Sequence, residues 1–380
     1  MGPKRRICLA AALLVLAASF PHAFAQGDPA RGSHRHSFEK FEKGNKGLAT
    51  AGHRAAHKAR QGGASQGGRV SLQGAADPFI AAAGDISCDE SIDPHTASTC
   101  HDRETSNLIY PNTAAGHGGT CQGLTVCYKR VLMLGDGQYE NGSLFAYQAY
   151  YDPTWGRFKS ITRPVPGNHQ YHSSGATGYF RYFGSLAGPS GQGYYSYNLG
   201  AWHLIALNAN LNPAYPYGGT SAQWTAELNW LVNDINANAT GANPRPCILA
   251  YWHQPRFAST PQRGHPPDQN VQPFWNRLYT AGDPLRTADI VLNGHNHVYE
   301  RFAKMTSTGA ASRNGIREFI VGTGGKNWDG PRKNVAPNSQ FYNGSVFGIL
   351  RLGLQTSGYS WAFVSEGGGI LDRGSDTCNV

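Results

Sequence analysis

Polar side chains that bind metals or transfer protons follow five separate apolar runs of this sequence. Each cluster comes directly after its run, and most clusters include glycine. The clusters are Gly84-Asp85, Gly135-Asp136-Gly137-Gln138-Tyr139, Pro166-Gly167-Asn168-His169, His253, and Gly294-His295-Asn296-His297. Because ligand groups beyond the carboxyl ends of strands meet in one crevice of an open α/β sheet, we expect the clusters to lie together. Glycine would let the backbone come close to a bound ion.

The donor atoms in these clusters suit a pair of metal ions. They comprise two carboxylates, one carboxamide, one phenol and four imidazoles, whereas a single metal ion needs only three or four such ligands. Hard oxygens combined with imidazoles are typical of iron, zinc or manganese rather than of thiolate-bound structural zinc. Two ions about 3.5–4 Å apart hold a phosphoryl group, and one of them lowers the pKa of a bound water to about 7. The residues therefore predict hydrolysis of a phosphate ester.

Each cluster also has an ordinary structural explanation. A single aspartate at a strand end is most often a turn former, and a single histidine is usually a satisfied surface or core residue. Five polar clusters, each directly after an apolar run, are hard to explain in that way together. We therefore favour the metal-binding interpretation.

The apolar runs indicate the strands that must position the clusters. We interpret them as buried strands because each is short, apolar and ended by a turn residue or a histidine. They are Phe79–Ala83, Val131–Leu134, Ile161–Val165, Trp202–Leu207, Ile248–Trp252, Ile290–Leu292 and Glu318–Val321.

Helical periodicity and a final pair of alternating segments complete the expected architecture. A helix is predicted over residues 221–236, because apolar side chains recur there at spacings of three and four, and a second helix over 144–151. Residues 346–354 and 359–364 alternate as two paired strands. Strands mixed with helices predict a single large α/β domain over residues 76–380.

The order of the five clusters resembles that of the calcineurin-like metallophosphoesterases, and within them the purple acid phosphatase branch, of a secreted bacterial type. The likeness extends over about residues 78–325. It rests partly on Ser87, which stands where the wider family has a histidine, and on Tyr139, which would replace that ligand. The resemblance implies an α/β fold of two packed mixed β-sheets flanked by helices, a four-layer αββα sandwich.

The resemblance also implies the ligands of two divalent or trivalent metal ions. One ion, expected to be iron, would take Asp85, Asp136, Tyr139 and His297. The other, expected to be zinc, manganese or a second iron, would take Asp136, Asn168, His253 and His295, so that Asp136 bridges.

Two further histidines would serve the substrate rather than the metals. His169 would lie over the phosphate as a transition-state donor or as a general acid to the leaving group. Gln170 stands where the branch usually has Glu, which leaves the orientation of His169 open. His265 is expected either to contact the phosphate or to be a loop histidine.

The expected activity is that of a secreted, acid phosphatase-like enzyme, which hydrolyses phosphomonoesters by attack of a metal-bound hydroxide. A phosphodiesterase or nucleotidase on the same metal centre is the alternative. A third interpretation is a non-enzymatic secreted protein that binds an anionic polymer and uses metals only to stabilise its fold. The substrate is expected to be a small phosphate ester.

The first 75 residues carry the net charge of +9. Lys4-Arg5-Arg6, the apolar run 7–20 and Ala23-Phe24-Ala25 predict a secretory signal peptide over residues 1–25, cleaved near Ala25. Residues 26–75 hold nine basic and three acidic residues and too few large apolar ones to fold, so a disordered basic linker is predicted. Its electrostatic contact with anionic surface polymers is weak at most.

The rest of the chain gives little reason to expect nucleic-acid or membrane binding. Residues 76–380 contain 21 basic and 21 acidic residues, which argues against specific nucleic-acid recognition. No later segment is long and apolar enough to be a transmembrane helix.

Six cysteines remain after the leader, and an oxidising compartment would pair them. Fifteen pairings are possible, and some cysteines could stay free. Cys121–Cys127 closes a short loop and is the pair we expect first. Cys88–Cys100 is next, which leaves Cys247–Cys378.

Overall fold

Two mixed β-sheets face each other in the computed structural model of the protein, which describes residues 77–379. The predicted signal peptide (1–25) and basic linker (26–75) lie outside the described residues. The first sheet has the strand order β15-β14-β13-β1-β2-β3. Its strands are β1 (Phe79–Ala83), β2 (Tyr128–Leu134), β3 (Thr162–Val165), β13 (Gly348–Leu354), β14 (Gly358–Ser365) and β15 (Ile370–Thr377).

The second sheet has the order β12-β9-β10-β8-β6-β5-β4. Its strands are β4 (Tyr195–Leu199), β5 (Trp202–Ala206), β6 (Cys247–Tyr251), β8 (Ile290–Asn293), β9 (Tyr299–Phe302), β10 (Arg317–Val321) and β12 (Ser339–Asn343). A small ribbon pairs β7 (Thr260–Pro261) with β11 (Arg332–Asn334). Each sheet contains a set of neighbouring parallel strands: β1, β2 and β3 in the first, and β5, β6, β8 and β10 in the second.

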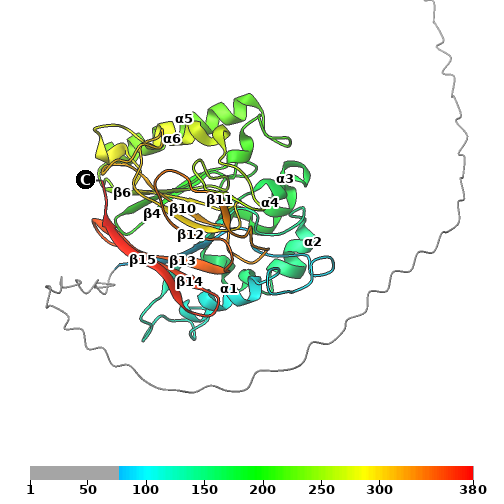
Figure 1. Cartoon of the computed structure of the whole chain (residues 1–380). Coiled ribbons are helices and arrows are strands. Elements are labelled where there is room, and N and C mark those ends of the chain that lie inside the picture. The colour runs from blue at the N-terminus through cyan, green and yellow to red at the C-terminus, as the bar shows by residue number, and fades with distance from the viewer. Residues whose placement is uncertain (1–76, 380) are drawn as a thin grey trace, which may run out of the picture. The chain divides into compact units, whose positions relative to one another are not determined.

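Helices cover the outer faces of the two sheets. Figure 1 shows α5 and α6 along one side and α1 on the opposite side. The helices are α1 (Asp102–Ile109), α2 (Leu144–Ala146), α3 (Asn168–Tyr171), α4 (Thr177–Phe183), α5 (Ser221–Thr240) and α6 (Gln272–Leu278). This arrangement confirms the four-layer αββα architecture.

The alternation of side chains along the strands creates two apolar cores. In β6, Cys247, Leu249 and Tyr251 pack in the core between the sheets, while Ile248 and Ala250 face the core beneath α5 and α6. Strand residues point alternately to the two faces of a sheet, so a continuous apolar run is buried on both faces. This explains why the central strands could be recognised from short apolar runs.

Helix α5 forms where its periodicity predicted a helix. Trp224, Leu228, Leu231 and Ile235 are all buried on its inner face. Its N-terminus is closed by a capping box, in which Thr220 and Gln223 exchange side-chain and backbone hydrogen bonds. The helix predicted over 144–151 is α-helical only to Ala146 and continues as a π-helix over Tyr147–Tyr151.

The three expected disulfides are all present: Cys88–Cys100, Cys121–Cys127 and Cys247–Cys378. Their Cα atoms are 5.5 to 5.8 Å apart, within the range that a disulfide spans. Among residues 77–379, no helix combines the length and the apolar character that a membrane crossing requires.

Candidate metal centre

The five polar clusters meet where the parallel strands of both sheets end. Asp85 follows β1, Asp136 follows β2, Asn168 follows β3, His253 follows β6, and His295 follows β8. Backbone hydrogen bonds join the two sheets here, because the Gly84 N–H donates to the Val321 carbonyl at 2.9 Å. One carboxylate or imidazole atom from each of Asp85, Asp136 and His253 lies within 4.8 Å of the others. The sheet topology therefore brings the predicted ligands into one cluster.

The first group of donors contains Asp85, Tyr139 and His297. The Tyr139 hydroxyl donates to Asp85 Oδ1 at 2.8 Å and lies 3.1 Å from His297 Nε2. His297 Nε2 is 3.3 Å from the same carboxylate oxygen. The other oxygen of Asp85 accepts the His295 backbone N–H at 2.8 Å. Three possible ligand atoms thus face one another, and Asp85 is held with Oδ1 toward them.

The second group contains Asp136, His253 and His295. His253 Nε2 lies 3.1 Å from Asp136 Oδ2 and 3.2 Å from His295 Nδ1. His253 Nδ1 donates to the Leu134 carbonyl at 2.9 Å, because a carbonyl oxygen can only accept. Nε2 is therefore the nitrogen that points into the cluster, as the ligand nitrogen does in metal-bound histidines whose other nitrogen is hydrogen-bonded.

Three of the converging residues have a left-handed backbone. The φ angles of Asp85, Asp136 and His295 are 59°, 42° and 69°. Non-glycine residues in this region cost roughly 1–3 kcal/mol each and persist only where the surroundings hold them, often at functional sites. The backbone strain therefore falls on three of the predicted metal ligands.

Glycine is required beside the cluster at two positions. A Cβ on Gly135, whose φ is 86°, would lie 2.3 Å from the His253 ring, and one on Gly167 would lie 2.1 Å from Asp136 Oδ1. Glycine is thus needed at these two positions because the backbone lies against ligand side chains, whereas the sequence suggested close approach to a bound ion.

The charges of the cluster alter the pKa values of its members. Burial favours the neutral form of Asp136, but His253 and His169 outweigh it and hold the pKa of this carboxyl below its usual range. Burial opposes protonation of His253, yet Asp136 raises the pKa of this imidazole to about 9. Burial, together with Asp136 and Asp85, raises the pKa of the Tyr139 phenol well above its ordinary value. Without a cation, the proton on His253 offsets the negative charge of Asp136. A bound metal ion would displace that proton and supply the positive charge instead.

His169 lies at the edge of the cluster and is oriented by a backbone group. Its Nδ1 donates to the Glu140 carbonyl at 2.7 Å, and its Nε2 lies 4.0 Å from Asp136 Oδ2. Gln170 does not contact the ring; its side chain accepts from Gly167 N–H at 2.8 Å and donates to the Gln138 carbonyl at 3.2 Å. The orientation left open by Gln170 is thus fixed by Glu140.

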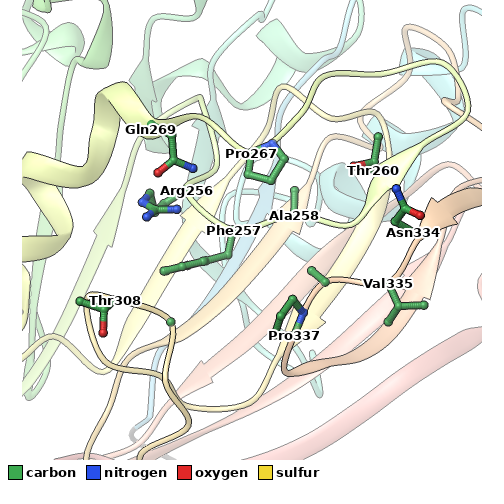
Figure 2. Close-up of a pocket in the computed structure, with 12 residues that line it drawn as sticks. Arg256, Phe257, Ala258, Thr260, Pro267, Gln269, Thr308, Asn334, Val335 and Pro337 are labelled. Carbon is green, nitrogen blue, oxygen red and sulfur yellow. The ribbon is translucent and has the colours of Figure 1, made fainter.

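His265 reaches the same region from the loop after β7. Its ring stacks on His295, with centroids 4.1 Å apart, and its carbonyl accepts from Asn296 at 3.0 Å. A hollow of about 290 Å³ lies under the same loop, lined by Phe257, Pro267 and Val335 among others (Figure 2). None of the predicted ligands lines this hollow.

Comparison with known proteins finds partial sequence similarity to purple acid phosphatases. No family model matches the chain. Purple acid phosphatase 15 of Arabidopsis thaliana is 29% identical over 168 residues, 41% of this chain and 29% of that protein. Purple acid phosphatase 23 of the same plant is 30% identical over 172 residues, 42% of this chain and 34% of that protein. The similarity thus spans only about a third of each of these relatives.

Solved structures share the fold. A purple acid phosphatase from yellow lupin seeds superposes with a TM-score of 0.56 at 14% identity, over 80% of this chain and 54% of that one. The chain therefore resembles purple acid phosphatases in part of its sequence and shares their fold. A second structural neighbour of this chain is the anchor in the inner membrane complex of Plasmodium, with a TM-score of 0.53 at 13% identity, over 80% and 89% of the two chains. Function must therefore be argued from the site rather than from the fold.

The donor set of this chain fits a pair of metal ions. Asn168 Oδ1 and His297 Nδ1 are buried, and neither has a hydrogen-bond partner in the described part of the chain. A buried polar atom without a partner is costly, and Asn168 carries the amide predicted as a ligand. The fit therefore rests on two facing donor groups and on the unpaired amide oxygen of Asn168, whose neighbour His169 donates its backbone N–H to Asp136.

The sequence did not predict the residues that surround the ligands and contact them. Asp329 accepts the His297 backbone N–H at 2.8 Å. The Lys326 ammonium pairs with Glu140 and lies 4.9 Å from the centroid of the Tyr139 ring. Asp329 and Lys326 belong to the loop after β10, where no apolar run or motif pointed to them.

Proposed function

We propose that this protein hydrolyses phosphate monoesters at a binuclear metal centre, in the manner of an acid phosphatase. The observation that carries the proposal is the pair of facing donor groups, with Asp136 Oδ2 within 3.1 Å of His253 Nε2 and Asp85 Oδ1 within 3.3 Å of His297 Nε2. Two metal ions bound there would lower the pKa of water and neutralise charge on the phosphoryl oxygens.

The ligand assignment divides the donors by their contacts. Asp85, Tyr139 and His297 would hold one ion, proposed to be iron. His253, His295 and Asn168 would hold the other, proposed to be zinc, manganese or iron. Asp136 would serve both.

Asp136 is positioned for a shared role because only one of its oxygens is committed elsewhere. Oδ1 accepts the His169 backbone N–H at 3.0 Å, while Oδ2 faces the imidazoles. The side chain is buried, so the carboxylate cannot turn outward to water. This geometry favours Asp136 as the bridging ligand.

His169 would act on the substrate. Because its Nδ1 proton is given to the Glu140 carbonyl, its Nε2 is the atom that can present or transfer a proton above the cluster. A donor there would stabilise charge on a phosphoryl oxygen or protonate the departing alcohol. His265, stacked on His295, is proposed to contact the phosphate from the opposite loop.

We also propose that the protein works outside the cytoplasm, in the periplasm or the extracellular space. Three disulfides within the described residues support this, because such bonds persist in oxidising compartments. The predicted signal peptide supplies the route.

The test is phosphate release from a monoester and a diester, with metals measured on the same purified sample. The proposal expects release from the monoester and loss of activity after chelation, with recovery on adding metal back. Release from the diester alone would replace it by the phosphodiesterase alternative. A metal-containing protein that releases phosphate from neither ester would contradict it.

A further inference from the structure

A second hollow of about 460 Å³ opens next to His169. Its walls include Tyr171, His172, Leu211 and Tyr217, and we call it the aromatic hollow. The volume is within the range of small-molecule sites, roughly 300–1,000 Å³. None of the predicted metal ligands lines it, so it adds space beyond the metal centre.

A row of rings connects the metal centre to this hollow. The centroids of Tyr139 and His169 are 4.3 Å apart, those of His169 and His172 are 4.7 Å apart, and those of His172 and Tyr217 are 5.4 Å apart. His169 and His172 both donate from Nδ1 to the Glu140 carbonyl, at 2.7 and 3.0 Å. The proposed proton donor and the wall of the aromatic hollow are therefore held by the same atom.

The floor of the aromatic hollow is rigid and its rim is open. Tyr171 is buried and its hydroxyl accepts from Asn208 at 2.8 Å. A phenol is uncharged at neutral pH, and burial raises the pKa of Tyr171 further, to about 12. Tyr217, by contrast, is 60% exposed at the rim, where its ring is available for a ligand.

The lining determines the kind of group that would bind. Among the described residues that line the hollow, none is lysine, arginine, aspartate or glutamate. An ammonium group would therefore find no carboxylate there, and a second phosphate would find no lysine or arginine. Tyrosine and imidazole rings, however, stack well on flat aromatic groups.

We propose that the aromatic hollow binds a flat aromatic ring in the leaving alcohol of the substrate, with Tyr217 as the positioning residue. The inference rests on the proposed phosphatase function, because the phosphate would lie at His169. Tyr217 is two ring contacts beyond His169, so the bound ring must be separated from the ester oxygen by a spacer. A nucleoside 5′-monophosphate has this form, with a sugar between the base and the phosphate.

The kinetic test compares 5′-AMP with glycerol 3-phosphate in the full metal-loaded protein. Tyr217→Ala should raise the KM for 5′-AMP about tenfold, the effect expected from losing one base-stacking ring, with kcat nearly unchanged. For glycerol 3-phosphate, which has no ring, kcat/KM should stay within about twofold. Tyr217→Phe should restore the wild-type KM because it keeps the ring. Phe145→Ala removes another exposed aromatic side chain that does not line the hollow and should change neither substrate.

A binding measurement separates this proposal from the phosphatase proposal. Adenosine, which carries no phosphate, should bind the wild-type protein in NMR titration and bind Tyr217→Ala about tenfold more weakly. Two results would overturn the proposed role of the aromatic hollow and leave the phosphatase proposal intact. One is phosphate release from both esters without adenosine binding. The other is an equal loss of kcat/KM for both esters in Tyr217→Ala. Tyr217-dependent adenosine binding without any phosphate release would overturn the phosphatase proposal and leave the aromatic hollow as a site that binds an aromatic ring.

Discussion

Asp136 Oδ2 lies 3.1 Å from His253 Nε2, although the two residues are more than a hundred positions apart and follow strands of different sheets. Both side chains are buried. The outer nitrogen of His253 is fixed by the Leu134 carbonyl, and the outer oxygen of Asp136 by the His169 N–H. The contact therefore connects the two sheets at the place where the proposed metals would bind.

Removal of the His169 ring should impair catalysis without emptying the metal centre. His169→Ala keeps the backbone N–H that Asp136 accepts, so the ligands should stay in place. Turnover should fall by about 10²- to 10⁴-fold, which is typical of acid–base and oxyanion donors. The measurement is kcat together with metal content. If the metals were lost with the activity, His169 would have to be counted among the ligands.

The proposed coordination of iron by Tyr139 can be tested by visible absorption spectroscopy. A phenolate bound to ferric iron produces a charge-transfer band in the visible range, whereas zinc, with a filled d shell, produces none. Protein loaded with ferric iron should therefore be coloured, and Tyr139→Phe should bleach it. A visible spectrum that is unchanged in Tyr139→Phe at equal iron content would exclude Tyr139 as a ligand.

A methyl group on Gly167 should displace Asp136. The added Cβ would lie 2.1 Å from Asp136 Oδ1, which is closer than non-bonded atoms approach. Gly167→Ala should therefore lose metal and activity. Gly367→Ala is the matched control, because no atom lies within 4 Å of a Cβ there. Equal metal content in both variants would show that Asp136 is not held by this approach.

Asp102 should make the stability of the protein depend on pH. Burial raises the pKa of this carboxyl from 3.8 to about 6, although Thr154 and Ser87 donate hydrogen bonds to it. The folded protein then binds a proton that the unfolded chain has released, so this contribution to the free energy of unfolding falls as pH rises from about 4 to about 6.

The corresponding experiment compares wild type with Asp102→Asn in metal-free protein. Between pH 3.5 and 7 the difference in free energy of unfolding should move by about 3 kcal/mol in favour of the variant, since one pKa unit corresponds to about 1.4 kcal/mol. A pH-independent difference for Asp102→Asn would mean that the carboxyl does not titrate in this range.

The central strands could be predicted because burial on both faces leaves an apolar run in the sequence. Strand β15 (Ile370–Thr377) left no such signal, since it is an edge strand whose side chains are mostly exposed or partly exposed. Strand β12 is similarly polar and lies at the edge of the second sheet. Edge strands are defined by pairing with a neighbour rather than by an apolar pattern.

The candidate ligands could be predicted from the sequence for a related reason. The residues that orient the site could not. Each ligand follows a recognisable strand, so its place at the sheet edge is determined by local sequence. The carbonyl of Glu140 that orients His169, and the contact of His172 with Tyr217, depend on how long loops fold back. Such contacts join residues 29 and 45 positions apart, and nothing in the local pattern specifies them.

The central claim is a binuclear metal centre bridged by Asp136, and elemental analysis of wild type beside Asp136→Asn tests it most directly. Wild-type protein should contain two metal ions per chain, because the described donors form two groups. Asp136→Asn should lose metal and lower phosphate release by orders of magnitude, since an amide bridges two cations far less well than a carboxylate. Two metals retained in the variant with near-normal turnover, or a fully active wild type with no more than one, would contradict the account.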